Sequence, residues 1–396
     1  MAPTVVVSAA RTAIGKFGGA LAATPAVDLG GRAIGGALER AGIAGDQVDY
    51  VIMGQVLQAG AGQITARQAA LKGGIPDTVP AITINKVCLS GLNAIAIADQ
   101  MIRAGEASVV VAGGMESMDN APYLLPKART GYRMGDGKII DSMIYDGLWD
   151  AFTDMHMGAQ SETVNTEFSI SREDQDKWSA RSHSRAHAAM TEGRSADEIV
   201  PFEIPQRKGD PIVFDTDEGV RPDTTLESLA KLRTAFNKDG TITAGNASQI
   251  SNGGAAVVVM SAECAVELGV TPMAEIVAHG MSADRPPYLH TVPALAVQAA
   301  LKKAGLSAND LDLVEINEAF AAVALHSTKM LFNGNTDAEE KVNVNGGAVA
   351  LGHPIGCTGA RITVTLLHEL KRRGGGLGVA ALCGGGGQGD AIIYKV

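Results

Sequence analysis

Two segments far apart in the chain share one order of apolar and polar positions. Residues 33–54 read AIGGALERAGIAGDQVDYVIMG and residues 296–317 read AVQAALKKAGLSANDLDLVEIN, and seven of the 22 aligned positions are identical. In each copy apolar residues recur every three or four positions up to a glycine, a short polar link follows, and an apolar run closes the segment. The pattern predicts a helix that ends at the glycine and then a buried strand.

A second pair of segments repeats this organisation. LNAIAIADQMIRAG (92–105) and RITVTLLHELKRRG (361–374) have the period of amphipathic helices. Each is followed by a nearly continuous apolar run, SVVVAGG (108–114) or LGVAALCGG (377–385). Such runs are typical of strands that helices cover on both faces. We therefore predict a duplicated α/β unit with two similar halves that face each other.

The stretch between the two halves has a different composition. Residues 121–249 hold 10 of the 16 aromatic residues of the chain. Because large aromatic side chains need burial, this stretch is predicted to be an inserted subdomain and not a linker. Residues 250–271 return to Gly, Ala and Val and are expected to rejoin the first half. The predicted units are residues 1–120 plus 250–271, residues 121–249 and residues 272–396.

Composition and charge argue against several classes of function. The formal net charge is −10 and no basic run stands out, so nucleic acid is not expected as a partner. No apolar stretch reaches the ~18 residues of a membrane-spanning helix, so no membrane is expected either. Four cysteines in 396 residues do not make a disulfide framework, which indicates a reducing, cytoplasmic setting with free thiols. The glycine-rich loops fit neither of the common nucleotide-binding motifs.

Four side chains that can carry chemistry lie at the ends of predicted strands. Cys88 precedes a helix, whose dipole is expected to lower the pKa of the thiol. His353 lies in a glycine-rich turn, and Asn317 closes the strand of the second repeat. Cys383 opens CGGGGQG, where several backbone N–H groups are expected to surround one sulfur as an anion-binding nest. A thiol with an imidazole indicates covalent acyl transfer, and a second thiol indicates a second proton transfer.

Each candidate also has a purely structural interpretation. A free cysteine is often a buried small hydrophobe, a histidine in a turn often caps backbone groups, and Asn317 suits a helix N-cap. Cys264 and Cys357 are interpreted as packing residues. His183 and His187 lie four positions apart, but no third ligand lies nearby, so we interpret them as an exposed helix face and predict no metal site.

Six motifs, in this order along the chain, resemble those of the thiolase family: NKVCLSG (85–91), GGMESM (113–118), NAS (246–248), NEAF (317–320), NVNGGAVALGHPIGCTGAR (343–361) and CGGGGQG (383–389). Together they span essentially the whole chain and are highly specific. The resemblance implies an α/β fold in which two similar halves pack as five layers, αβαβα, with an inserted loop domain.

The resemblance also implies a role for each motif residue. Cys88 would take an acyl group from acyl-CoA as a thioester, His353 would deprotonate this thiol, and Cys383 would remove a proton from the α-carbon of a second acetyl-CoA. Asn317, through a bound water, and His353 would form one oxyanion hole. The backbone N–H groups of Cys88 and Gly385 would form the other. The two holes fit a Claisen condensation, which develops two oxyanions in turn.

The implied activity is the reversible condensation of two acetyl-CoA to acetoacetyl-CoA and CoA, without a metal ion or cofactor. The alternative within the family is a broader-chain degradative 3-ketoacyl-CoA thiolase. An alternative from another class is a non-catalytic acyl-CoA-binding relative. Such a relative is expected to lose a cysteine or the histidine, and this chain keeps all of them.

The inserted subdomain resembles that of the short-chain, biosynthetic branch, in MIYDGLWDAF (143–152) and the histidine that follows it. The contacts that this implies for the acyl group, pantetheine and CoA are made by Leu148, His156, Met157, Arg221, Ser248, Ala319 and Phe320. Residues 123–141 resemble the tetramerisation loop of that branch, so a homotetramer, built as a dimer of dimers, is expected. The chain departs from the usual family pattern at Gln249 and Asn252.

Overall fold

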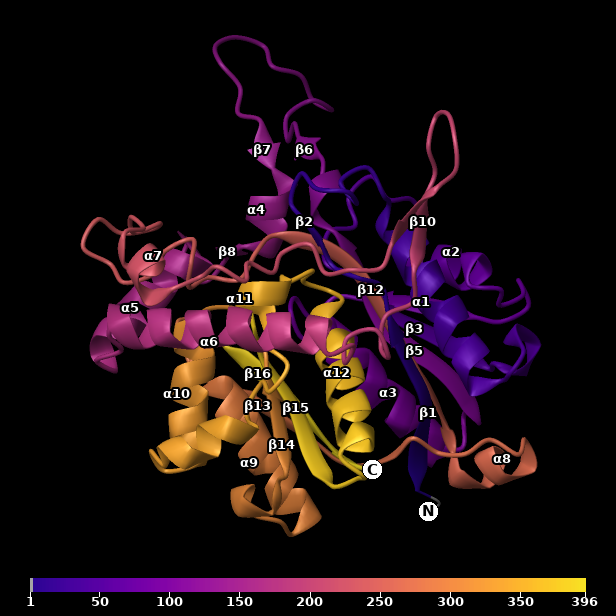
Figure 1. Cartoon of the computed structure of the whole chain (residues 1–396). Helices are drawn as coiled ribbons and strands as arrows, with labels where there is room; N and C mark the ends of the chain where they lie inside the picture. Colours follow the sequence, from indigo (N-terminus) through magenta and orange to yellow (C-terminus); the bar gives the residue numbers. More distant parts are fainter. Residues whose placement is uncertain (1–2) are drawn as a thin grey trace.

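The computed structural model describes residues 3–396 and is built around one large mixed sheet (Figure 1). Its ten strands run in the order β14-β15-β16-β13-β1-β12-β5-β3-β4, with the short β2 paired to β12. The strands of the first half are β1 (Thr4–Arg11), β2 (Gly15–Lys16), β3 (Tyr50–Gly54), β4 (Ala81–Ile84), β5 (Val109–Ser117) and β12 (Ser251–Ser261). Those of the second half are β13 (Ala274–Ala283), β14 (Leu313–Ile316), β15 (Leu377–Gly384) and β16 (Gln388–Lys395).

Both halves use the same strand order. The order β1-β12-β5-β3-β4 of the first half corresponds to β13-β16-β15-β14 of the second, and Val342 bridges Val314 in parallel where the first half has β4. The halves join where β1 pairs with β13 over two residue pairs. The predicted repeat is confirmed, because α1 (Ala26–Ala41) and α9 (Val292–Ala304) both end at a left-handed glycine and lead into β3 and β14.

Three layers of helices alternate with the two halves of the sheet, so the predicted five-layer arrangement is confirmed. Along β5, Val110 and Ala112 face the central apolar cluster, whereas Val109 and Val111 face the outer one. The outer helices are α1, α2 (Thr65–Lys72) and α8 (Ala262–Glu267) on the first half, and α9 and α10 (Ala321–Leu331) on the second. The central layer contains α3 (Ser90–Ala104) and α12 (Thr358–Arg372), whose apolar side chains share one cluster with both halves of the sheet.

Two glycines allow the central helices to meet at their N-terminal ends. A Cβ added at Gly91 of α3 would lie 2.8 Å from the backbone nitrogen of Ala360, and one added at Gly359 of α12 would lie 2.2 Å from that of Leu92. Only glycine fits such a close approach of two backbones. Cys88 directly precedes α3 and His353 precedes α12, so this crossing carries both loops to one region of the molecule.

The segment between β5 and β12 wraps around the end of the sheet from which these loops emerge (Figure 1). Its longest helix, α6 (Arg172–Thr191), contacts α10 and the short α11 (Ala348–Leu351). Its other elements are β6 (Tyr123–Leu124), β7 (Ile140–Asp141), α4 (Ser142–Gly147), β8 (Trp149–Asp150), β9 (Met155–His156), α5 (Met157–Glu167), β10 (Phe202–Ile204), β11 (Ile212–Phe214) and α7 (Leu226–Ala230). Within residues 3–396, no helix combines the length and the apolar character that crossing a membrane requires.

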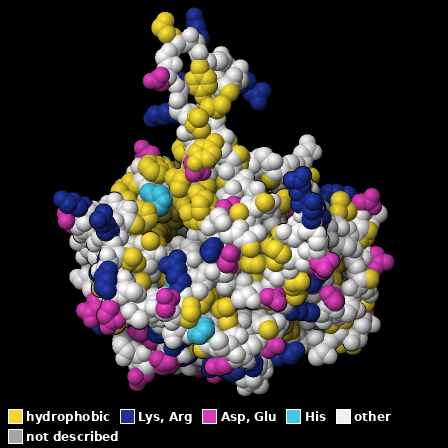
Figure 2. Space-filling model, turned by 45° about the horizontal axis from the view of Figure 1, so that its top comes forward, with side chains coloured by type: hydrophobic (Ala, Val, Ile, Leu, Met, Phe, Trp, Pro, Cys, Tyr) yellow, Lys and Arg dark blue, Asp and Glu magenta, His cyan; other side chains and the backbone are white. Residues whose placement is uncertain are grey.

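The loop between β6 and β7 extends away from the body of the molecule, and apolar side chains gather around a hollow at its base (Figure 2). Several of its apolar side chains are exposed to solvent, and Met134 is 95% exposed.

His290 is a buried neutral imidazole where α5, α9 and α10 meet. Its Nε2 atom lies 2.8 Å from Oδ1 of Asn165, and its backbone oxygen accepts a hydrogen bond from Ser327. Burial lowers the pKa of His290 to about 3. Because the unfolded chain takes up a proton at this residue below pH ~6.5, the native state loses about 1.4 kcal/mol per pH unit as the pH falls toward 3.

We therefore expect His290→Gln, which can still donate to Asn165, to gain stability relative to the wild type as the pH is lowered. Between pH 7 and pH 4.5 the difference in the free energy of unfolding should shift by about 2 to 3 kcal/mol in favour of the variant. Denaturant titrations at the two pH values measure this shift. His187→Gln, at an exposed position of α6, is the control. A difference that does not change with pH would contradict the prediction.

Candidate active site

Cys88 occupies a strained turn between β4 and α3. Val87 has a φ of 49°, which is rare for a β-branched residue and marks a turn that the surrounding structure holds in place. The Asn85 side chain accepts a hydrogen bond from the Val87 N–H at 2.9 Å. Ser90 Oγ accepts one from the Lys86 N–H at 2.8 Å and donates one to the Val87 carbonyl at 2.6 Å. These bonds fix the thiol of Cys88, which is 4% exposed, directly before the helix.

The turn between β15 and β16 carries Cys383 to the same place. Gly386 and Gly387 have left-handed φ values of 77° and 70°, which this tight turn requires. The Gly385 N–H lies close enough to the sulfur of Cys88 to lower the pKa of that thiol, and the charge of a Cys88 thiolate would raise the pKa of Cys383. The predicted nest therefore exists in a different form, because its Gly385 N–H serves the sulfur of Cys88 and not that of Cys383.

His353 and Asn317 complete the group. Asn317 Nδ2 lies 3.4 Å from His353 Nε2, and the Asn317 N–H donates to the carbonyl of Ala381, two residues before Cys383. The Oδ1 atom of Asn317 is buried and has no hydrogen-bond partner among residues 3–396. The loop that follows His353 lies against the start of α3, since a Cβ on Gly91 would meet the carbonyl of Gly356 at 3.0 Å. Four predicted residues and Gly385 thus surround one site.

Thr358 determines which nitrogen of His353 carries the proton. Its hydroxyl donates to the carbonyl of Pro354 at 2.9 Å and lies 2.6 Å from His353 Nδ1. When this hydroxyl donates its proton to Pro354, Nδ1 is the donor toward it. Nε2 is then unprotonated, so it accepts the Asn317 amide and is the nitrogen that can take a proton from a thiol. In the sequence, the only signal for this contact is the position of Thr358 five residues after His353, where α12 begins.

We expect Thr358→Val to lower kcat by roughly 10- to 100-fold, because His353 loses the partner that fixes its tautomer. The pH profile of kcat should also shift, which a purely structural change would not cause. Thr365→Val is the matched control, since Thr365 lies two turns along the same helix, is buried and makes no side-chain hydrogen bond. Equal kcat values for both variants would contradict this role of Thr358.

Burial dominates the electrostatics of the site. It raises the pKa of Cys88 to about 12, although the N–H groups of Cys88 and Gly385 act in the opposite direction. It also raises the pKa of Cys383 and lowers that of His353 to about 3. The expectation that the helix dipole gives Cys88 a low pKa is therefore wrong for the free protein, where both thiols and the imidazole are neutral. The thiolate has to form by proton transfer to His353 as substrate enters.

Glu116 is a buried residue of the site that the sequence reasoning did not single out. Its carboxylate accepts the N–H groups of Val56, Leu57 and Gly356 at 2.9–3.1 Å, and burial raises its pKa to about 7. It therefore ties the loop after β3 to the loop after His353. The only signal in the sequence is a carboxylate at the end of a strand that is otherwise apolar.

Four of the predicted substrate contacts lie in or against the apolar clusters that contain the two thiols. Met157, Ala319 and Phe320 share one apolar cluster with Cys383, and Leu148 packs against the central cluster that contains Cys88. His156 stacks on Phe236 at 4.6 Å, and Phe236 makes an edge contact with Phe320. The Ser248 N–H donates to the carbonyl of Ala319 at 3.1 Å.

Arg221 lies on a neighbouring loop, where its N–H donates to His183 Nδ1 at 3.1 Å. No contact places Arg221 in the apolar cluster of Cys383. His183 is 3% exposed, so its interpretation as part of an exposed helix face is wrong, whereas His187 is exposed as expected. Within residues 3–396 no group of three or more His, Cys, Asp and Glu side chains is arranged to hold a metal ion.

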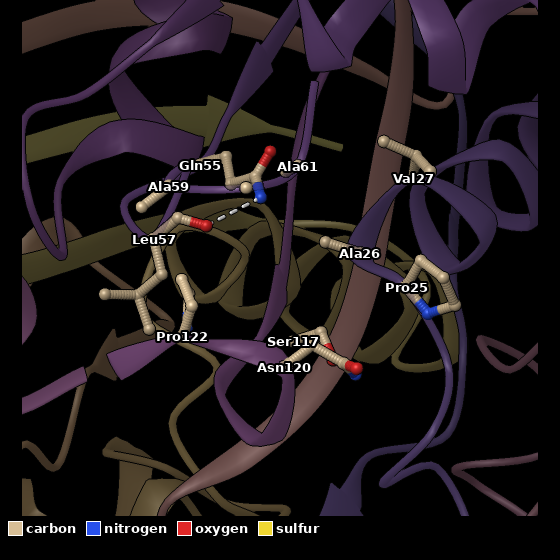
Figure 3. A pocket seen from close by; sticks show the side chains of 11 residues that line it. Pro25, Ala26, Val27, Gln55, Leu57, Ala59, Ala61, Ser117, Asn120 and Pro122 are labelled. Atoms are coloured by element: carbon tan, nitrogen blue, oxygen red, sulfur yellow. Dashed lines mark hydrogen bonds between the residues drawn. The ribbon is translucent and has the colours of Figure 1, made fainter. Parts of the chain in front are cut away.

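A separate cavity of about 260 Å³ lies near the start of α1 (Figure 3). Pro25, Ala26, Val27, Leu57 and Pro122 give it apolar walls, and Gln55 donates a hydrogen bond to the carbonyl of Leu57 beside it. None of the predicted site residues lines this cavity. The chemistry therefore belongs to the loops around the thiols.

The fold and the site together define the class of this protein. Residues 4–263 match the model of the thiolase N-terminal domain, and residues 270–396 match that of the C-terminal domain. The chain belongs to the thiolase family.

Relatives of known name are similar over their full length. A probable acetyl-CoA acetyltransferase of Mycolicibacterium smegmatis is 57% identical over 391 residues, which are 99% of this chain and 100% of the relative. An acetyl-CoA acetyltransferase of Pseudomonas aeruginosa is 53% identical over 99% of each chain. The crystal structure of the Bacillus anthracis acetyl-CoA acetyltransferase superposes with a TM-score of 0.96 at 45% identity, and covers 100% of this chain and 99% of that one.

Proposed function

We propose that this protein is an acetyl-CoA acetyltransferase, which condenses two acetyl-CoA to acetoacetyl-CoA and CoA and catalyses the reverse thiolysis. The observation that carries the proposal is the meeting of Cys88, Cys383, His353 and Asn317 in one buried site whose Gly385 N–H points at the nucleophilic sulfur. The names of the full-length relatives support acetyl-CoA as the substrate.

In the first half-reaction Cys88 attacks the thioester carbon of acetyl-CoA. His353 Nε2 takes the thiol proton, and this transfer offsets the high pKa that burial gives to Cys88. The N–H groups of Cys88 and Gly385 stabilise the oxyanion of the tetrahedral intermediate. The C–S bond to CoA then breaks, and the CoA thiolate leaves with the proton that His353 returns. The product is an acetyl thioester on Cys88.

In the second half-reaction Cys383 first gives its thiol proton to His353 and then, as a thiolate, removes a proton from the methyl group of a second acetyl-CoA. The enolate oxygen is stabilised by His353, with Asn317 acting through a bound water. The carbanion attacks the acetyl group on Cys88, and the C–S bond to Cys88 breaks as acetoacetyl-CoA forms. The sulfur of Cys88 returns as a thiol when His353 gives it the proton taken from Cys383, and Cys383 keeps the proton from the methyl group. Because these side chains supply the nucleophile and both bases, the reaction as proposed uses no metal ion or prosthetic group.

The apolar side chains of Leu148, Met157, Ala319 and Phe320, together with His156, would enclose the acyl group and pantetheine. Arg221 and Ser248 would contact CoA. This assignment is supported by the apolar clusters and ring contacts that most of these residues share with the two thiols or with each other.

We infer a homotetramer built as a dimer of dimers. The exposed apolar residues of the loop at 125–139 and the open edge of β4, where Ile82 is 43% exposed, support two different contacts between copies. We place the protein in the cytoplasm, which its four unpaired cysteines support.

A substrate-length series tests the function. We expect thiolysis of acetoacetyl-CoA to exceed that of C8 and longer 3-ketoacyl-CoAs in kcat/KM, and purified protein to form acetoacetyl-CoA from acetyl-CoA alone. Faster thiolysis of the C8 substrate would instead support the degradative, broader-chain thiolase.

A further inference from the structure

A buried ion pair connects the two halves of the molecule beside the nucleophile. Lys86, two residues before Cys88, donates from Nζ to both carboxylate oxygens of Asp390 at 2.9 and 3.0 Å. Asp390 lies on β16, and its side chain is fully buried, while that of Lys86 is 22% exposed. Asn93 of α3 adds a hydrogen bond to Asp390 at 3.3 Å, and His279 Nε2 lies too far for one, at 3.7 Å.

The same surfaces bring the two catalytic loops together. A Cβ on Gly384 would lie 2.6 Å from Leu89, and one on Gly385 would lie 3.4 Å from Val87. The turn that carries Cys88 therefore rests directly on the β15–β16 turn, and the Gly385 N–H reaches the sulfur of Cys88 across this contact. Within residues 3–396, the Lys86–Asp390 pair is the ion pair that adds opposite charges to this contact.

A buried ion pair of this kind is expected to add little to the free energy of unfolding. Desolvation of two charges offsets most of their attraction, and a well-packed apolar pair of the same size is often as stable or more so. Two charge-assisted hydrogen bonds from one ammonium group instead fix the distance between Lys86 and Asp390. Packing between apolar layers fixes such a distance less strictly, and β1 and β13 join the two halves of the sheet over two residue pairs.

We propose that Lys86 and Asp390 are positioning residues that hold the sulfur of Cys88 in register with the Gly385 N–H. This inference rests on the proposed function. It concerns the first half-reaction, in which the Gly385 N–H stabilises the oxyanion. Loss of the pair lets the two turns shift relative to each other, and a displacement of about 1 Å at a reacting centre can cost about 100-fold in rate.

The test measures acetylation of Cys88 by rapid quench and mass spectrometry in Lys86→Met and Asp390→Asn. We expect acetylation to be 10- to 100-fold slower in each variant, with KM for acetyl-CoA within about twofold of the wild type. Lys86→Arg should recover most of the rate because it restores the charge. Lys72→Met removes a more exposed Lys–Asp pair, with Asp28 at 2.6 Å, inside the first half, and should acetylate at the wild-type rate.

The double variant Lys86→Met, Asp390→Leu keeps the test decisive if a single variant does not fold. We expect it to melt near the wild-type temperature and still to acetylate slowly. If it regains both stability and wild-type acetylation, or if the folded single variants acetylate normally, the positioning role is overturned. A wild-type protein that gains no acetyl group would refute the proposed function instead.

Discussion

Replacing Cys88 with serine is expected to lower acetoacetyl-CoA formation by roughly 10³- to 10⁶-fold, as loss of a covalent nucleophile does in other enzymes. The substitution changes one atom in a site where the backbone is already held by Asn85 and Ser90, so the fold should persist. A hydroxyl is a far weaker nucleophile than a thiol at neutral pH, and His353 cannot compensate for this difference.

Acetylation of the chain by acetyl-CoA checks the result. Incubation with acetyl-CoA should add one acetyl group to the wild-type chain at Cys88 and none to the variant. Cys357→Ser is the matched control, because Cys357 is also buried, at 1% exposure, and precedes the other central helix. Acetylation of the Cys88→Ser chain at another cysteine would contradict the assignment of the nucleophile.

Replacing Cys383 with alanine is expected to separate the two half-reactions. Condensation and thiolysis should fall by roughly 10²- to 10⁴-fold, the usual contribution of a general base. Acetylation of Cys88 should continue, because the Gly385 N–H comes from the backbone and His353 remains in place. The variant should therefore accumulate as the acetyl-enzyme.

Deuterium exchange provides the direct test for Cys383. The wild type should wash deuterium from solvent into the methyl group of acetyl-CoA, and Cys383→Ala should not. If the variant exchanges at the wild-type rate, another group removes the α-proton. If it cannot be acetylated at all, Cys383 takes part in the first half-reaction, and the division of roles proposed here is wrong.

Burial of the two thiols and of His353 determines their charge before substrate binds. Burial raises the pKa of Cys88 to about 12 and lowers that of His353 to about 3, so the free protein holds neutral groups that do not react with water. Charge appears only when substrate supplies an oxyanion for the N–H groups to stabilise. A site of this kind protects its thiols until acetyl-CoA is present.

Much of the architecture followed from sequence patterns, because they record local physics. Helical periodicity ending at Gly42 and Gly305 predicted α1 and α9, and apolar runs predicted the buried strands β5 and β15. The motifs that resemble the family identified Cys88, His353, Cys383 and Asn317, because each of these residues lies next to glycines or at a strand end that the sequence predicts.

Other features depend on distances between residues that are far apart in the chain, so only the tertiary structure decided them. Burial reversed the expected pKa shift of Cys88, and the turn after Cys383 directs its Gly385 N–H to the other thiol. The contacts of Glu116 and of the Lys86–Asp390 pair could not be predicted from the sequence, because they join segments 59 to 304 positions apart. Local sequence determines which helices and strands form. Desolvation and side-chain contacts across the layers determine the protonation and the contacts of the residues at the ends of these elements.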